Sequence, residues 1–202
     1  MFIGRKDELN FLEEKYQSNS GEFIVIYGRR RVGKTETIKR FCEGKKHVFY
    51  TCVECPDEQQ LKGLSNRLLQ TGMPAANYIK SFSDWEQAIG SITEIPGKEK
   101  KILVIDEFPY MVRVNHSIPS ILQKLWDEEL KNQNVMIILC GSAMSFIEKE
   151  ILAEKNPLYG RATGILKMKE MDFYDAMQFV PNYTAEEKII TYAILGGIPH
   201  YL

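Results

Sequence analysis

Short apolar runs recur along the chain and alternate with segments in which apolar residues have helical spacing. Five of these runs have the length and composition of buried strands, at residues 23–27, 47–53, 102–105, 135–140 and 164–168, the last being the weakest. Continuous apolar runs, unlike alternating ones, are typical of parallel strands that are covered on both faces. The pattern therefore predicts a mainly parallel five-stranded sheet.

Four of the intervening segments carry helix signals. One covers residues 9–16, one opens at the capping box Ser83–Glu86, one has Pro119 in its first turn, and one runs from the capping box Thr184–Glu187 to Leu195. Strands that alternate with helices predict an α/β fold. We expect three layers, in which helices cover both faces of the sheet.

The composition is that of a globular protein, with 202 residues, 44% of them hydrophobic and 26% charged. A formal net charge of −1 gives no global basic excess of the kind that binds nucleic acid or an anionic membrane. The first residues form no secretory signal, and the longest apolar runs are far too short to span a bilayer. Four cysteines do not make a disulfide scaffold. We therefore expect a reduced, cytoplasmic protein that has no membrane partner.

Residues 28–35 read Gly-Arg-Arg-Arg-Val-Gly-Lys-Thr and match the phosphate-binding pattern G-x-x-x-x-G-K-[ST], the P-loop or Walker A motif. A buried strand precedes the motif and a helix, residues 36–42, follows it, which is the context that the pattern requires. The two glycines let the backbone wrap around an anion, and the N–H groups of the loop and helix face the phosphates. The nucleotide-binding residues that we expect here are Gly28, Arg29, Arg30, Arg31, Val32, Gly33, Lys34, Thr35 and Glu36.

The side chains of this loop differ in their expected roles. Lys34 should contact the β- and γ-phosphates of ATP and take part in catalysis, and Thr35 should ligate Mg²⁺ through its hydroxyl. For the three arginines, a solvated or salt-bridged role is favoured over a catalytic one.

Two carboxylates, Asp106 and Glu107, directly follow the apolar run 102–105. The carboxyl ends of parallel strands face the ligand crevice, so Asp106 should lie near the Mg²⁺ that Thr35 holds. Glu107 should point to the other side of the strand and activate a water for attack on the γ-phosphate. The chain has no Asn-Lys-x-Asp and no Asp-x-x-Gly at this strand, which disfavours a GTPase.

Together these residues resemble the additional-strand P-loop ATPases of the AAA+ and STAND type, and more narrowly the archaeal-type ATPase family, which is also widespread in bacteria. The resemblance runs from Phe2 to Leu202. The P-loop and the acidic strand end, or Walker B motif, are common to many ATPases, whereas their combination with the first and last segments is more specific. The segments that carry the resemblance are residues 2–9, 27–35, 103–108, 139–142, 157–161 and 196–202.

The resemblance implies roles at both ends of the chain. In such ATPases the segment that matches Phe2 and Ile3 lies against the adenine, although these residues also suit an anchor for the N-terminal helix. Residues 197–199 resemble the Gly-x-Pro motif of the STAND lid, whose proline, here Pro199, packs near the adenine. The glycines alone are equally typical of a helix stop followed by a turn.

Two further residues are implied as catalytic. Ser142 ends the fourth predicted strand, where these ATPases place a polar sensor of the γ-phosphate, and the alternative is an N-cap for the helix that starts near Ala143. Arg161 lies where related ATPases place an arginine finger that reaches the nucleotide of a neighbouring subunit, which would imply self-association. A structural salt bridge or a contact within the same chain is the alternative for Arg161.

Cys52 and Cys55 form a C-x-x-C pair, with Cys42 and His47 upstream. A zinc site would require these side chains to converge. Cys42 is predicted to lie near the strand starts and the pair near the opposite end of the second strand, and a second cysteine pair is missing. Zinc is therefore disfavoured.

We expect an ATP-binding domain that hydrolyses ATP with Mg²⁺ and couples hydrolysis to movement of attached domains. A slowly hydrolysing, nucleotide-gated signalling switch and a DNA-processing ATPase are the alternatives. A small-molecule kinase is disfavoured because Glu107 directly follows Asp106, because Ser142 resembles a sensor and because the terminus resembles a lid.

Residues 1–171 should form the P-loop core, and residues 172–202 the beginning of a helical lid. Members of the family usually continue into a winged helix and a further C-terminal domain. We therefore expect the chain to be a fragment of a longer protein, which would contact DNA only through those later domains.

Overall fold

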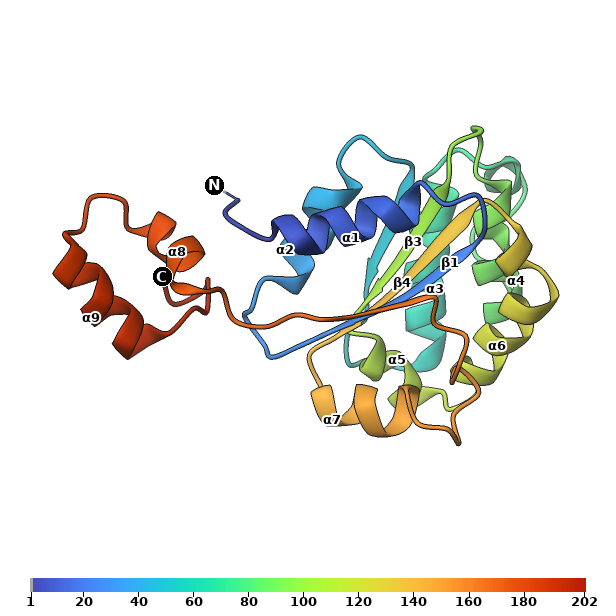
Figure 1. Cartoon of the computed structure of the whole chain (residues 1–202). Helices are drawn as coiled ribbons and strands as arrows, with labels where there is room; N and C mark the ends of the chain where they lie inside the picture. Colours follow the sequence, from blue (N-terminus) through green and yellow to red (C-terminus); the bar gives the residue numbers. More distant parts are fainter. Residues whose placement is uncertain (1) are drawn as a thin grey trace.

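A parallel five-stranded sheet forms the centre of the computed structural model, which describes residues 2–202 (Figure 1). The strands lie in the order β2-β3-β4-β1-β5, and every neighbouring pair is parallel. The predicted α/β fold and its five strands are thus confirmed. The strands are β1 (Glu22–Tyr27), β2 (His47–Thr51), β3 (Lys101–Asp106), β4 (Val135–Gly141) and β5 (Gly164–Lys167).

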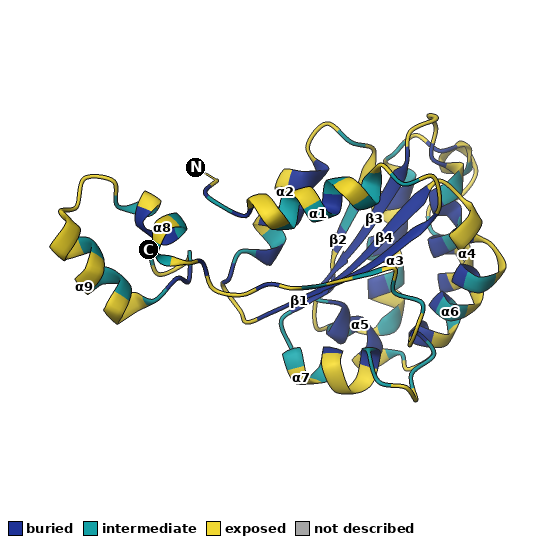
Figure 2. Ribbon diagram, viewed as in Figure 1, coloured by how far each residue is buried: buried dark blue, intermediate teal, exposed yellow. Residues whose placement is uncertain are grey.

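Helices cover both faces of this sheet. On β1, Phe23 and Val25 point into one apolar cluster, whereas Ile24 and Ile26 point into the other, as expected for side chains that alternate along a strand. The three central strands are buried at every position, which explains their unbroken apolar runs (Figure 2). The first cluster packs against α3 (Asp57–Leu69), α4 (Trp85–Gly90), α5 (Phe108–Val114) and α6 (Ile118–Glu128), and the second against α1 (Lys6–Tyr16) and α2 (Lys34–Cys42).

Several helices of the core differ from the sequence prediction. The helix after Ser83 begins one residue later than its capping box implied, because the Asp84 carboxylate is the side chain that accepts from the Gln87 N–H, at 2.8 Å. It ends at Gly90 and continues only as a 3₁₀ turn. Helices α3 and α5 were not predicted at all. The remaining turns in the core are η1 (Pro74–Asn77), η2 (Ser91–Glu94), η3 (Leu130–Asn132), α7 (Met144–Phe146) and the π-helical η4 (Ile147–Ile151).

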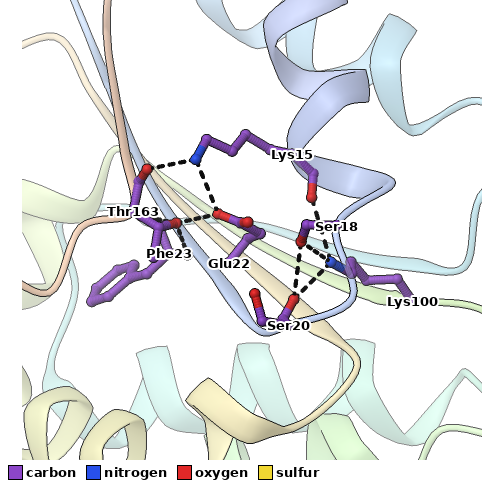
Figure 3. Close-up of polar contacts among 7 residues, drawn as sticks. All are labelled: Lys15, Ser18, Ser20, Glu22, Phe23, Lys100 and Thr163. Carbon is purple, nitrogen blue, oxygen red and sulfur yellow. Dashed lines mark hydrogen bonds and ion pairs between the residues drawn. The ribbon is translucent and has the colours of Figure 1, made fainter.

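A network of hydrogen bonds and ion pairs connects the amino ends of the strands (Figure 3). The buried Lys100 ammonium, just before β3, donates to Ser18 Oγ and to the carbonyl oxygen of Ser20, both at 2.8 Å. Burial lowers the pKa of Lys100, and the nearby Glu22 carboxylate acts in the opposite direction. Glu22 in turn accepts from Thr163 Oγ1, at the start of β5. The network ties together three strands and the end of α1, far from the carboxyl ends where a ligand would bind.

The last segment forms a small helical unit beside the carboxyl ends of the strands (Figure 1). It comprises α8 (Phe173–Ala176), η5 (Met177–Phe179) and α9 (Ala185–Leu195), and the predicted capping box at Thr184 is present. Met171, Ala176 and Met177 form an apolar cluster of their own. Much of α9 faces solvent, including Ile189 and Ile194 (Figure 2). Within residues 2–202, no helix has both the length and the apolarity to cross a bilayer.

Candidate functional site

The loop of residues 28–33 joins β1 to α2 at the carboxyl end of the sheet. Gly33 has a φ of 95°, which favours glycine, and it serves as the N-cap of α2. The side chain of Lys34 is buried, and its ammonium donates to the carbonyl oxygens of Gly28 and Arg29, both at 2.9 Å. The loop therefore places a buried cation and the free N–H groups of a helix start at one point, as anion binding requires.

Thr35 and Asp106 meet at the end of β3. Thr35 Oγ1 donates to Asp106 Oδ2 at 2.8 Å, and the Glu107 N–H donates to the other carboxylate oxygen at 3.0 Å. Burial, and then the Asp106 carboxylate, hold the pKa of the neighbouring Cys140 thiol well above its ordinary value. A hydroxyl and a carboxylate are the hard oxygen ligands that Mg²⁺ prefers, so the two residues fit that ion.

Glu107 occupies an unusual backbone conformation next to this pair. Its φ of 52° and ψ of 41° lie in the left-handed region, which costs a non-glycine residue about 1–2 kcal/mol. Ser142 Oγ and N donate to Glu107 Oε2 at 3.1 and 3.3 Å. Ser142 is not an N-cap, because Ala143 holds that position before α7 and no side chain caps this helix. Backbone strain of this kind clusters at functional sites.

Lys34, Thr35, Glu107 and Ser142 line one cavity of about 600 Å³, and Asp106 is not part of its lining. The topology explains why they meet, since β1, β3 and β4 end side by side and each contributes the residues that follow its carboxyl end. The cavity thus brings together the expected residues Lys34, Thr35, Glu107 and Ser142 with the end of the chain. Its lining residues are Arg30, Arg31, Gly33, Lys34, Thr35, Glu36, Glu107, Tyr110, Ser142, Pro199 and His200.

The three loop arginines have different partners. Arg29 forms an ion pair with Glu170 at 2.6 Å, as favoured from the sequence. Among residues 2–202, the partners of the Arg30 guanidinium are two hydroxyls, with Nε 3.5 Å from Ser142 Oγ and Nη2 3.3 Å from the Tyr110 hydroxyl.

Arg31 is turned toward the end of the chain. Its guanidinium lies 5.6 Å from the centre of the Tyr201 ring, and Nη1 is 3.5 Å from the hydroxyl of that tyrosine. Arg31 thus contacts the segment after α9, whereas Arg30 contacts Ser142 at the end of β4 and Tyr110 of α5.

The segment after α9 packs on the phosphate-binding loop. A Cβ added at Gly33 would lie 3.9 Å from Pro199 Cγ. Gly197 lies against the backbone of Met171, whose N–H donates to the Gly197 carbonyl oxygen at 2.7 Å. Helix α9 ends at Leu195, as the helix-stop interpretation of the glycines requires, and the adenine contact of Pro199 stays a prediction.

The N-terminal segment also contacts the loop. Ile3 is buried and Phe2 is exposed, and the adenine contact expected of both residues stays a prediction. Sequence reasoning missed Arg5, which is buried and donates through Nη2 to the Val32 carbonyl oxygen at 2.6 Å. Within the described part of the chain, Arg5 Nε is the buried side-chain polar atom that has no hydrogen-bond partner. The signal that could have identified Arg5 is its place in the segment 2–9, which is one of those that carry the family resemblance.

Arg161 is not brought to the cavity. It precedes β5, at the amino end of the sheet, and its guanidinium binds the Asp127 carboxylate of α6 through Nε at 3.1 Å and Nη2 at 2.7 Å. Nη1 donates to the Pro157 carbonyl oxygen at 2.8 Å. Within the chain, Arg161 thus forms the structural salt bridge that was the alternative to an arginine finger.

Cys52 of the cysteine pair lies beside the end of β3, where its N–H donates to the Asp106 carbonyl oxygen at 2.8 Å. Cys52 is buried, and burial raises the pKa of its thiol far above the ordinary value. Across residues 2–202, no group of three or more histidine, cysteine, aspartate or glutamate side chains is placed to hold a metal ion.

Comparison with known proteins gives a consistent result. A family described as an ATPase domain predominantly from Archaea matches residues 2–202. The chain is 38% identical over its 202 residues to the uncharacterized protein MJECL04 of Methanocaldococcus jannaschii. It spans 43% of the length of that relative.

Two solved structures are similar in fold. The Walker-type ATPase PABY2304 of Pyrococcus abyssi matches with a TM-score of 0.74 and 21% identity, over 98% of this chain and 65% of that one. The STAND protein with a tetratricopeptide repeat sensor, PH0952 of Pyrococcus horikoshii, matches with a TM-score of 0.61 and 18% identity, over 98% of this chain and 28% of that one. At these identities the likeness shows the fold alone.

Proposed function

The chain belongs to the family of ATPase domains found predominantly in Archaea, and from this premise we propose that its cavity binds ATP with Mg²⁺ and hydrolyses it to ADP and phosphate. The family match confirms the resemblance predicted from the sequence. The observation that carries the proposal is the arrangement at the end of β3, where Thr35 Oγ1 lies 2.8 Å from Asp106 Oδ2 and Glu107 is the next residue. A metal-ligand pair and a base therefore adjoin the phosphate-binding loop.

Binding rests on the loop. The N–H groups at the start of α2 and the Lys34 ammonium face the phosphates, which would replace the carbonyl oxygens of Gly28 and Arg29 as partners of Lys34. Thr35 and Asp106 would hold Mg²⁺, which when bound neutralises charge on the β- and γ-phosphates. Phe2, Ile3 and Pro199 are proposed to bind the adenine, as in the ATPases that this chain resembles.

Hydrolysis rests on Glu107. Its carboxylate accepts a proton from a water molecule as that water attacks the γ-phosphorus. Ser142 donates two hydrogen bonds to Glu107 Oε2 and so fixes the orientation of the carboxylate. The left-handed backbone conformation of Glu107 turns the chain out of β3 and into α5 at this residue. A general base of this kind contributes about 10²–10⁴-fold in rate.

The contacts at the chain end support a switching role. Pro199 lines the same cavity as the loop, Arg31 lies over the ring of Tyr201, and Arg29 pairs with Glu170. The loop is therefore connected to the segments that flank the last helical unit on both sides. A change in the phosphates held by the loop would shift these contacts and move the unit. We propose that hydrolysis drives this movement.

A slowly hydrolysing switch is the second candidate. It is favoured by the two hydrogen bonds that Ser142 donates to Glu107 Oε2. These bonds occupy one oxygen of the carboxylate and would slow its reaction with a water molecule. Both candidates share the binding site and differ in turnover rate.

Phosphate release from ATP, with and without Mg²⁺ and with no acceptor molecule added, tests the proposal. We expect Mg²⁺-dependent release, which would also exclude a kinase that needs an acceptor. Lys34→Ala should severely weaken ATP binding, because it removes the cation buried in the loop. Unchanged ATP affinity in this variant would refute the binding site.

A further inference from the structure

We propose that Arg30, a side chain of the phosphate-binding loop itself, is the cation that stabilises the transferring γ-phosphoryl group within its own subunit. The inference rests on the proposed ATPase function and deepens it. It makes the site complete without an arginine from a neighbouring subunit, and it gives a catalytic role to a loop arginine for which the sequence favoured a solvated or salt-bridged one.

The position of Arg30 carries the inference. Its guanidinium lies beside Ser142 Oγ and the Tyr110 hydroxyl, at 3.5 and 3.3 Å, and Ser142 in turn binds Glu107. Arg30 also lines the same cavity as Lys34 and Glu107. The guanidinium is therefore on the strand-end side of the loop, next to the base, where the γ-phosphate and the attacking water must meet.

The partners of Arg29, Arg31 and Arg161 also favour Arg30 for this role. The Arg29 guanidinium is paired with Glu170, and that of Arg31 lies over the Tyr201 ring. Arg161 is held by Asp127 at the amino end of the sheet. Arg30 forms no ion pair within residues 2–202, and its hydroxyl partners at 3.3–3.5 Å are long. Its charge is thus free for an anionic ligand at the base.

Hydrolysis of ATP develops negative charge that a nearby cation such as the Arg30 guanidinium would stabilise. The water oxygen forms a bond to the γ-phosphorus, and the bond from this phosphorus to the bridging oxygen breaks, leaving its electron pair on ADP. The water gives one proton to Glu107, and the products are ADP and inorganic phosphate. Negative charge spreads over the oxygens of the transferring group, where a guanidinium stabilises it more than in the ground state.

The first test compares Arg30→Ala and Arg30→Lys with the wild type in phosphate release and in nucleotide binding. Arg30→Ala should lower kcat by at least about 100-fold, and Arg30→Lys should retain part of the rate because it keeps the charge but not the planar fork. ADP affinity should stay near that of the wild type, while a non-hydrolysable ATP analogue should bind more weakly. Wild-type kcat in Arg30→Ala overturns the inference.

Arg40→Ala is the matched control. Arg40 lies on the exposed surface of α2, where it pairs with Glu43, so its loss should leave the rate unchanged. An equal fall in both variants would mean a general effect of removing an arginine near the loop, and would also overturn the inference.

A mixing experiment separates action within one subunit from action between subunits. Arg30→Ala lacks the cation and Glu107→Gln lacks the base, so each should be inactive alone. If Arg30 serves its own nucleotide, an equimolar mixture should also be inactive. Restored phosphate release in the mixture would show that Arg30 serves a neighbour, and would overturn the inference.

Failure of the proposed function gives a different pattern. A wild-type protein that releases no phosphate refutes the ATPase proposal and the catalytic role of Arg30 together. The binding comparison still tests the contact in that case, because only a γ-phosphate contact makes Arg30→Ala discriminate between the ATP analogue and ADP. Equal affinities of wild type and variant for the analogue would refute the contact.

Discussion

Removing the hydroxyl of Ser142 is expected to slow ATP hydrolysis while leaving ATP binding almost unchanged. Ser142 Oγ donates to Glu107 Oε2 at 3.1 Å and the Ser142 N–H donates at 3.3 Å, so Ser142→Ala deletes the shorter bond. A hydrogen bond to a charged group contributes about 1.5–3 kcal/mol. Complete loss in the transition state would lower kcat roughly 10- to 150-fold. Because the N–H remains, we expect a fall near the lower bound, about 10-fold.

The assay is steady-state phosphate release with Mg-ATP, from which kcat and KM are obtained separately. Ser142→Thr is the control, because it keeps a hydroxyl at the same position and should retain most of the rate. An unchanged kcat in Ser142→Ala would show that hydrolysis does not use the hydroxyl contact. A higher kcat would show that Ser142 restrains Glu107 instead of positioning it, and either result refutes the reasoning.

Two further predictions concern the parts that support the site. A Cβ at Gly197 would lie 1.8 Å from the Met171 carbonyl oxygen, so Gly197→Ala should lower stability by about 1–3 kcal/mol and weaken ATP binding. Gly90→Ala, whose Cβ meets Leu125 Cδ2 at an ordinary 3.7 Å, is the control, and equal melting temperatures for the two variants would contradict the prediction. Lys100→Ala removes the two 2.8 Å hydrogen bonds that the Lys100 ammonium donates in the network of Figure 3 and should cost about 1–3 kcal/mol. Thermal unfolding measures this cost, and a loss no larger than that of the exposed Lys98→Ala would refute it.

Much of the fold could be predicted because its signals are local. Continuous apolar runs gave the five strands within a few residues of their observed bounds, and the loop motif identified the strand–loop–helix unit around Lys34. The capping box at Thr184 was also found at its observed position. At Ser83 the same motif was one residue early, because Asp84 competes for the cap. A local pattern thus predicts that a helix is present, whereas its first residue depends on which neighbouring side chain, here Asp84 and not Ser83, caps it.

The rest depended on partners that lie far away in the sequence. Ser142 and Glu107 meet only because β3 and β4 are neighbours in the sheet, so the choice between sensor and N-cap was open from the sequence. Arg161, in the turn before β5, binds Asp127, a partner 34 residues away on α6, and no spacing rule reveals that pair. Arg5 was missed because its contact with the loop spans 27 residues and uses a backbone oxygen.

Phosphate release by Glu107→Gln, measured beside its ATP affinity, tests the central claim most directly. The amide keeps the size of the side chain and removes its capacity to accept a proton. If Glu107 is the base, the variant should bind Mg-ATP as the wild type does and lose phosphate release by about 10²-fold or more. Turnover at the wild-type rate would contradict the claim that this carboxylate, held by Ser142 at the end of β3, activates the attacking water.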